Sequence, residues 1–487
     1  MGVGGCEVRR CFADKIPDMR IVRLAVAALA MATITAQAAE GITAIVGATI
    51  VHPDREASKA VEADQTVIIA GDRIVGVGPA KTTRVPRGAT RIEARGKWLV
   101  PGLVDAHVHF FQSGNLYTRP DGADFGAYMP YAKEDARNRA RVAATFKVWL
   151  ASGVTSVVDI GGPFWNFEVR ELARRSDAAP RVIVAGPLVS MVDRVKLDLG
   201  DPPIVKTTTV GEVVDLVRKE IDRKADYIKV WFIYRPGDDI AAQEALVKAA
   251  GDSAHAAGIP LAVHATELVT AKGALRAGAD YLVHSIEDAP IDDEFIALMK
   301  KNKALYCPTL YVIMGYRQMF SNQWHATDIE KRRADPEILP MMDDLATIPK
   351  EAVPERVAAL MAKPPEIKPS QTMLDNLKKV WDAGIPVAMG TDAGNVGTLH
   401  GPSVFREMEL MAQAGLTPLE VLRAATVGGA RAMRMERDLG RIEAGRLADL
   451  VILDADPTAS VVNLARAYRV IKAGRIYAPD DLIKSIR

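Results

Sequence analysis

The stretch that decides the fold is KWLVPGLVDAHVHF, residues 97–110. Its apolar residues surround a Pro–Gly pair and are typical of a buried strand. The stretch ends in two histidines, His107 and His109, that are one residue apart. Because successive strand residues point to opposite faces, both imidazoles are expected on the same face. Two neutral imidazoles in this arrangement can chelate a divalent ion, so the strand predicts half of a metal site.

From this strand onward, apolar segments alternate with amphipathic helical segments, several of which end in glycine. Eight β/α units in series predict an α/β protein with a (β/α)8 TIM-type barrel over residues 101–436. The predicted strands are 102–110, 154–162, 181–189, 227–232, 260–266, 280–286, 304–310 and 385–394.

The two ends of the chain share a sequence pattern that differs from that of the middle. Residues 40–100 and 437–487 are short alternating segments separated by Gly, Asp and Pro, which predicts one small β-sandwich domain assembled from both termini. Two long interruptions, 111–131 and 311–380, fall after predicted barrel strands, where active-site loops lie. They are candidates for the substrate lid and pocket, and surface elaboration or a dimer contact is an equal alternative.

The first forty residues resemble a secretory signal. Arginines, a short apolar run over 24–34 and the small residues AQA at 36–38 form the three expected regions. We predict that residues 1–39 are a signal peptide with an upstream extension, and that the mature protein is periplasmic or secreted. The start codon, Met1 or Met19, stays open, and a retained N-terminal anchor is the alternative.

Composition excludes some partners. Lys and Arg number 62 against 61 Asp and Glu, so the net charge of +1 offers no field for nucleic acid or an anionic membrane. A small-molecule partner is therefore expected, with no membrane association after signal cleavage; a homo-oligomer is left open. Cys6 and Cys11 fall in the segment expected to be removed. Cys307 then has no disulfide partner, and its apolar neighbours predict a buried inert thiol.

Ligand-type side chains stand on five of the predicted strands, near the end that forms the barrel mouth. Each one alone has a structural explanation, such as a hydrogen-bonded core histidine or a buried ion pair. Together they favour a single site, while His52, His255 and His325 have no such placement and are interpreted as non-catalytic. The candidate ligands are His107, His109, Lys229, His264, His284 and Asp392.

Lys229 stands between apolar residues, where burial lowers the pKa of an amine. A neutral amine can add carbon dioxide and become a carbamate, which could bridge two metal ions. Such a pair would ionise a shared water for attack on a carbonyl, and Asp392 would pass the proton to the leaving group. In this arrangement one ion is held by His107, His109 and Asp392, and the other by His264 and His284.

The same segments resemble the amidohydrolase superfamily over nearly all of the mature chain. The tail over 415–457 resembles its imidazolonepropionase-like and metallo-dipeptidase-like branch. The resemblance implies the six ligands above, a carboxylated Lys229 and two metals, often zinc. Imidazolonepropionase resembles a one-metal version without this lysine, so Lys229 argues against that particular reaction. The carrying segments are VPGLVDAHVHF, IKVWF, AVHAT, VHSIEDAPIDDEF and GTDAG.

Two differences from dipeptidase-like relatives limit what the resemblance implies about substrate specificity. FIYRPGDD follows the fourth strand where dipeptidase-like relatives often have a Gly-rich SGG, and HATE stands where they often have HAHG. Tyr234, Arg235 and His400 are candidates for substrate contacts, with ordinary loop hydrogen bonds as the equal alternative.

The sequence thus predicts an exported binuclear amidohydrolase acting on a dipeptide, an N-acyl amino acid or a cyclic amide. One alternative is a mononuclear deaminase or cyclic-imide or lactone hydrolase with an unmodified Lys229. Another is a non-catalytic binding protein on the same fold.

Overall fold

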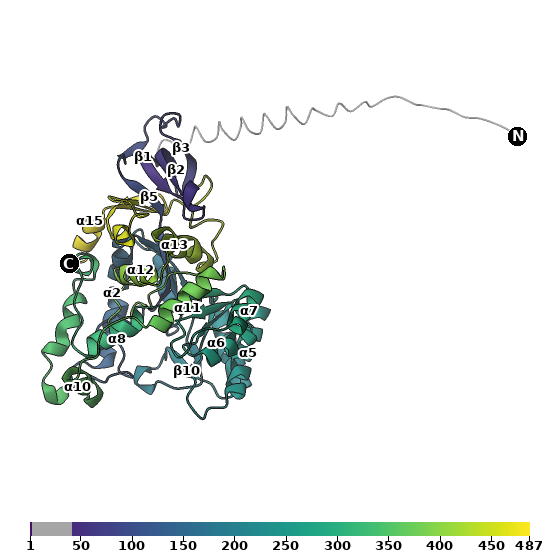
Figure 1. The fold of residues 1–487 in the computed structure, drawn as a ribbon, viewed down its shortest axis with the longest axis vertical. Coiled ribbons are helices and arrows are strands. Elements are labelled where there is room, and N and C mark those ends of the chain that lie inside the picture. Colours follow the sequence, from purple (N-terminus) through teal and green to yellow (C-terminus); the bar gives the residue numbers. More distant parts are fainter. Residues whose placement is uncertain (2–40) are drawn as a thin grey trace.

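The computed structural model describes Met1 and residues 41–487 (Figure 1). The predicted signal segment, with Cys6 and Cys11, lies outside the described residues, and its cleavage stays a prediction. Helices and strands alternate through the middle of the chain, so the predicted α/β class is confirmed. Among residues 41–487, each helix is too short or too polar to span a bilayer.

Strands from both ends of the described chain share one eight-stranded sheet, visible as the purple and yellow strands at one end of the molecule (Figure 1). The link is the antiparallel pair β5–β15, in which Leu450 lies opposite Pro101. The predicted sandwich of two sheets and the domain limits stay predictions. The strands are β1 (Ile42–Val51), β2 (Val61–Ala70), β3 (Arg73–Pro79), β4 (Thr90–Glu93), β5 (Trp98–Pro101), β15 (Leu450–Leu453), β16 (Ala467–Lys472) and β17 (Arg475–Tyr477).

The parallel strands of the middle form two sheets. The first is β6-β7-β8 and the second is β10-β9-β11-β12-β13-β14. Most of their residues are buried on both faces, as expected for a parallel sheet covered by helices. These strands are β6 (Leu103–Val108), β7 (Val154–Asp159), β8 (Arg181–Val184), β9 (Leu188–Ser190), β10 (Ile204–Lys206), β11 (Ile228–Trp231), β12 (Leu261–His264), β13 (Tyr281–Val283) and β14 (Leu305–Cys307).

The prediction of an eighth regular strand over 385–394 is wrong. This segment makes only isolated parallel bridges, to Tyr306 of β14 and to Val108 of β6, although its backbone hydrogen-bonds on both sides. A further isolated bridge joins Ala185, directly after β8, to Tyr227, directly before β11. The strands are therefore consistent with a TIM barrel but do not form one continuous closed ladder.

The backbone of this segment explains the irregularity. At Gly390 a Cβ atom would lie 2.5 Å from the Cys307 sulfur, so the chain approaches β14 more closely than a side chain allows. Two residues later Asp392 has a φ of 61°, a left-handed conformation that ends an extended run.

Helices follow most of the parallel strands. In Figure 1, α5, α6 and α7 lie on the opposite side of the molecule from α8 and α10. The α-helices are α2 (Tyr131–Ala151), α3 (Asn166–Arg175), α4 (Val210–Asp222), α5 (Ile240–Ala256), α6 (Leu268–Arg276), α7 (Asp293–Asn302), α8 (Val312–Phe320), α9 (Asp328–Arg333), α10 (Glu355–Ala362), α11 (Gln371–Asp382), α12 (Ser403–Gln413), α13 (Pro418–Arg423), α14 (Gly429–Ala432) and α15 (Pro479–Lys484). Short 3₁₀ helices are η1 (Ala57–Lys59), η2 (Val195–Leu197), η3 (Leu339–Ala346), η4 (Lys350–Ala352) and η6 (Val461–Ala465), and η5 (Ala424–Gly428) is a π-helical turn.

The two long insertions pack against each other. The loop between β6 and α2 contributes Leu116, Tyr117 and Phe125 to an apolar cluster that also contains Phe320 and Trp324 of the insertion after β14. Burial of these side chains fixes both loops beside the ends of the parallel strands. Segments about two hundred residues apart therefore form one wall beside the candidate site.

Candidate metal centre

Three buried side chains from two segments converge where β6 ends. The Nε2 atoms of His107 and His109 lie 3.2 Å apart. Asp392 Oδ1 lies 3.3 Å from the first nitrogen and 3.0 Å from the second. The shared face that strand alternation predicts is thus present, and a carboxylate from a distant segment completes the group.

Hydrogen bonds of the Nδ1 atoms fix the orientation of the histidine rings. His109 Nδ1 lies 2.7 Å from the carbonyl oxygen of Gly161, which can only accept, so Nδ1 carries the proton and Nε2 keeps its lone pair. His284 Nδ1 lies 2.8 Å from Thr309 Oγ1. His284, Thr309 and Asp392 all have positive φ values, of 78°, 43° and 61°. Such strained backbone at a cluster of polar groups is typical of functional sites.

The other two candidate histidine ligands lie in the same cluster. His264 ends β12, and its ring centroid lies 4.3 Å from that of His284. The ring of His284 in turn lies 4.8 Å from that of His107. Burial, with smaller contributions from nearby cationic groups, holds the pKa of His107, His264 and His284 well below the usual range. The imidazoles are therefore neutral, which is the form that binds metals.

Lys229 lies in β11 and lines the same cavity. Its side chain is 1 % exposed, and its Nζ has no hydrogen-bond partner among the described residues. Burial lowers the pKa of this amine to about 7. An unpartnered buried amine is costly, and a neutral amine facing four imidazoles and a carboxylate fits conversion to a carbamate that binds metal. Among the described residues, His107, His284 and Asp392 offer ligand atoms that all lie within 4.8 Å of one another, so this donor set fits a divalent ion.

Asp105 does not line the cavity, but it hydrogen-bonds to the two segments that carry His107 and Asp392. Its carboxylate accepts hydrogen bonds from the backbone of His107 and from the backbone and hydroxyl of Thr391. It thus ties β6 to the segment that carries Asp392. Burial raises the pKa of Asp105 to about 7 despite these bonds.

Replacing Asp105 by alanine is expected to destabilise the protein by about 3 kcal/mol, because two buried backbone N–H groups lose their acceptor. Urea denaturation of the metal-free protein measures this change. Asp328→Ala, which removes a fully solvated carboxylate, is the control. A difference below about 1 kcal/mol between the two variants would show that Asp105 does not hold these segments together.

The site lines a cavity of about 270 Å³. The sequence predicts that both long loops contribute to the pocket, but it does not identify the individual residues that these loops and neighbouring segments place in the cavity. Asn395 donates to Asp392 Oδ1 at 2.7 Å and accepts from Arg119 at 3.0 Å and from Tyr316 at 2.8 Å. Trp231, the last residue of β11, also lines this cavity.

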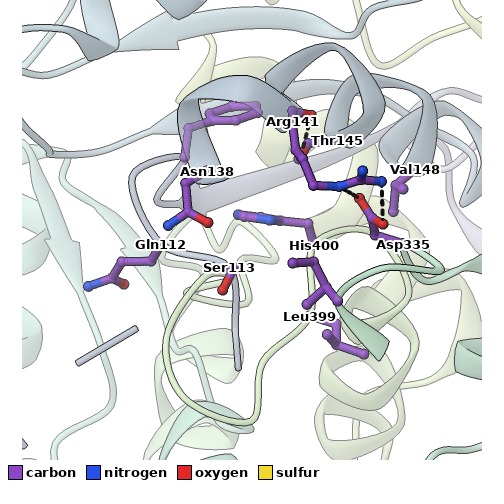
Figure 2. Close-up of a pocket in the computed structure, with 11 residues that line it drawn as sticks. Gln112, Ser113, Asn138, Arg141, Thr145, Val148, Asp335, Leu399 and His400 are labelled. Carbon is purple, nitrogen blue, oxygen red and sulfur yellow. Dashed lines mark hydrogen bonds and ion pairs between the residues drawn. The ribbon is translucent and has the colours of Figure 1, made fainter. Parts of the chain in front are cut away.

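The three predicted substrate contacts lie elsewhere. His400 lines a separate cavity of about 20 Å³ with Ser113, Asn138 and Arg141, where Arg141 pairs with Asp335 (Figure 2). Its Nε2 lies 3.1 Å from the carbonyl oxygen of His109, and burial lowers its pKa to about 4. It therefore supports the backbone of a candidate ligand.

Tyr234 and Arg235 do not line the larger cavity, and Arg235 is exposed.

Cys307 is buried, and burial raises the pKa of its thiol, as expected for an inert cysteine. His52 lies beside Glu62, and His255 pairs with Asp280 at 2.7 Å, so both are placed away from the cluster. His325 does not line the cavity either.

Comparison with known proteins gives one consistent family. A sequence profile described as the amidohydrolase family matches residues 98–477. An imidazolonepropionase from Streptomyces avermitilis is 26 % identical over 407 residues, covering 80 % of this chain and 81 % of its own. An imidazolonepropionase from Micrococcus luteus is 25 % identical and covers 89 % of this chain and 98 % of its own.

Solved structures show a similar fold. A putative prolidase from Bifidobacterium longum superposes with a TM-score of 0.67 at 22 % identity, covering 92 % of this chain and 99 % of its own. A Xaa-Pro dipeptidase with bound methionine superposes with a TM-score of 0.65 at 22 % identity, covering 90 % of this chain and all of its own.

Proposed function

The chain belongs to the amidohydrolase family, and from this premise we propose that it hydrolyses a carbon–nitrogen bond of a small substrate with the help of two divalent metal ions. The observation that carries the proposal is Lys229, a buried amine with no hydrogen-bond partner among the described residues, which lies beside four imidazoles and a carboxylate. The six candidate ligands are His107, His109, Lys229, His264, His284 and Asp392.

Divalent ions at this site, with zinc as the expected metal, would polarise a carbonyl and lower the pKa of a water molecule. The chain supplies the proton transfer. Burial opposes ionisation of Asp392, but interactions with the nearby groups His109, His284 and Lys229 lower its pKa below the usual range. Asp392 is thus a carboxylate at neutral pH, able to accept a proton and deliver it to the leaving nitrogen. Asn395 fixes the orientation of this carboxylate.

Amide and peptide-like substrates are favoured over the alternatives. The structural relatives described as prolidase and Xaa-Pro dipeptidase support a dipeptide, with an N-acyl amino acid or a cyclic amide as further candidates. A mononuclear deaminase or cyclic-imide or lactone hydrolase would leave Lys229 unmodified, and a non-catalytic binding protein would have no use for six intact ligands. We further propose export to the periplasm or medium, a carboxylated Lys229 and action without nucleic-acid or membrane partners.

The function is tested by a panel of dipeptides, N-acetyl amino acids, cyclic amides and lactones, assayed with zinc, cobalt or manganese. Activity is expected to vanish after treatment with a chelator and to return when metal and bicarbonate are added together. Hydrolysis that persists at full rate after complete metal removal would contradict the proposal. So would a metal-loaded protein that hydrolyses lactones alone.

A further inference from the structure

Arg119 is an arginine placed in the wall of the catalytic cavity by the loop between β6 and α2. Its side chain is only 15 % exposed. Its Nε and one terminal nitrogen donate to the two carboxylate oxygens of Asp121, both at 2.7 Å, and the other terminal nitrogen donates to Asn395 Oδ1 at 3.0 Å. The guanidinium is therefore held in one orientation.

These contacts leave part of the group free. A guanidinium carries five N–H donors, and three of them are used here. The other two have no partner among the described residues. Two free N–H donors on a guanidinium held in one orientation can donate to the oxygens of a second carboxylate.

The charge of Arg119 is only partly balanced. Asp121 is shared with Arg194, whose Nε lies 3.1 Å from Asp121 Oδ2. Two guanidiniums therefore share one carboxylate, which leaves a positive charge. Arg194 also stacks on the ring of Trp231, another cavity residue, with its guanidinium carbon 4.6 Å from the ring centroid.

Of the other carboxylates near Arg119, Asp392 acts on its guanidinium but is a candidate metal ligand, whose charge a divalent ion would offset. Glu287 also lines the cavity, but its side chain is exposed, so solvent weakens its repulsion of an anion. Asp193 is exposed on the loop of Arg194, and exposed Arg235 adds further positive charge near it. The Arg119 side of the cavity thus favours a negative group.

Arg119 is also close to the reacting group. One residue, Asn395, separates it from Asp392, through hydrogen bonds of 3.0 Å and 2.7 Å. We propose that Arg119 binds a carboxylate of the substrate, one that lies a few bonds from the scissile C–N bond. This rests on the proposed function and narrows it: the substrate is a dipeptide or an N-acyl amino acid with a free carboxylate, and not a neutral cyclic amide.

The test compares two forms of one substrate. The panel member with the highest kcat/KM is assayed beside its carboxamide, which has the same shape without the charge. We expect the wild-type protein to prefer the carboxylate at least tenfold. In Arg119→Gln the preference is expected to fall to about twofold or less, mainly through a higher KM for the carboxylate form. Arg119→Lys retains a positive charge and is expected to be intermediate.

This ratio is measured within each variant, so a loss of folded protein does not change it. Arg218→Gln, which removes an exposed arginine of α4, keeps the wild-type ratio. If Arg119→Gln lowered both rates equally, the arginine would only support Asn395 and Asp121, and the inference would be wrong. A wild-type protein with no preference for the carboxylate would overturn it as well.

A binding experiment tests this inference independently of the proposed function. If no panel member is hydrolysed, calorimetry is run with N-acetyl-L-leucine and N-acetyl-L-leucinamide, whose side chain suits the apolar wall formed by Leu188, Ile204 and Ile313. Carboxylate-dependent binding that disappears in Arg119→Gln would support the inference without any catalysis. Equal binding of both compounds, or binding of neither, contradicts it.

Discussion

Replacing Lys229 by methionine is expected to lower kcat/KM by about 10³-fold or more, while the metal-free protein becomes no less stable. Methionine fills a similar volume but cannot form a carbamate, so the bridging ligand is lost. The wild-type amine is 1 % exposed with no hydrogen-bond partner among the described residues, and its removal relieves an unfavourable burial. Activity with added zinc and bicarbonate, metal content and urea denaturation measure these effects.

Lys229→Met is informative because it is expected to lower activity without lowering stability. A residue that only supports the fold would lose stability and activity together. Lys219→Met, at an exposed position of α4, is the matched control and is expected to change neither. A Lys229→Met protein that retained both its metal content and its activity would show that the lysine is a packing residue and that no carbamate bridge is needed.

Replacing Asp392 by asparagine is expected to lower kcat by a factor of about 10² to 10⁴, the range typical of a lost acid–base group. Asparagine keeps the shape of the side chain but cannot accept and return a proton at neutral pH. It also weakens the contact to His107 and His109, whose Nε2 atoms lie 3.3 and 3.0 Å from Asp392 Oδ1. Steady-state kinetics at saturating metal measure the change.

Saturating metal separates the two contributions of Asp392. If excess zinc restores metal content but not kcat, the carboxylate acts in proton transfer; if it restores both, Asp392 is only a ligand. Asp328→Asn, on the solvated first turn of α9, is the control with an unchanged kcat. A kcat within about threefold of wild type at full metal content would refute the assigned role of Asp392.

The candidate ligands could be predicted because each one stands at or near the end of a segment with a clear apolar pattern. In parallel strands such ends meet at one edge, so His107, His264 and His284 were expected together before any contact was known. Six of the predicted strands correspond to β6, β7, β11, β12, β13 and β14. The prediction of one strand over 181–189 is wrong, because this segment forms β8 and β9 in different sheets, and β10 was not predicted. The segment that carries Asp392 has an equally apolar pattern, but its close approach at Gly390 and the left-handed Asp392 interrupt the ladder.

The wall of the cavity could not be predicted in the same way. Arg119 and Asn395 are 276 residues apart, and their contact depends on how two irregular loops pack. No periodicity marks either residue. His400 lines the smaller cavity, because nearness in sequence to Asp392 does not decide which cavity a loop side chain enters, and its role as a substrate contact stays a prediction.

The central claim is that Lys229 helps to hold two metal ions. The most direct test is the metal content of purified protein that has been stripped, reloaded with zinc and bicarbonate, and freed of excess metal. The account predicts two ions per chain in the wild type, with carbon dioxide bound to Lys229 detected by isotope-labelled bicarbonate, and fewer than two ions in Lys229→Met. One ion or none per wild-type chain, or two ions in both proteins, would contradict it.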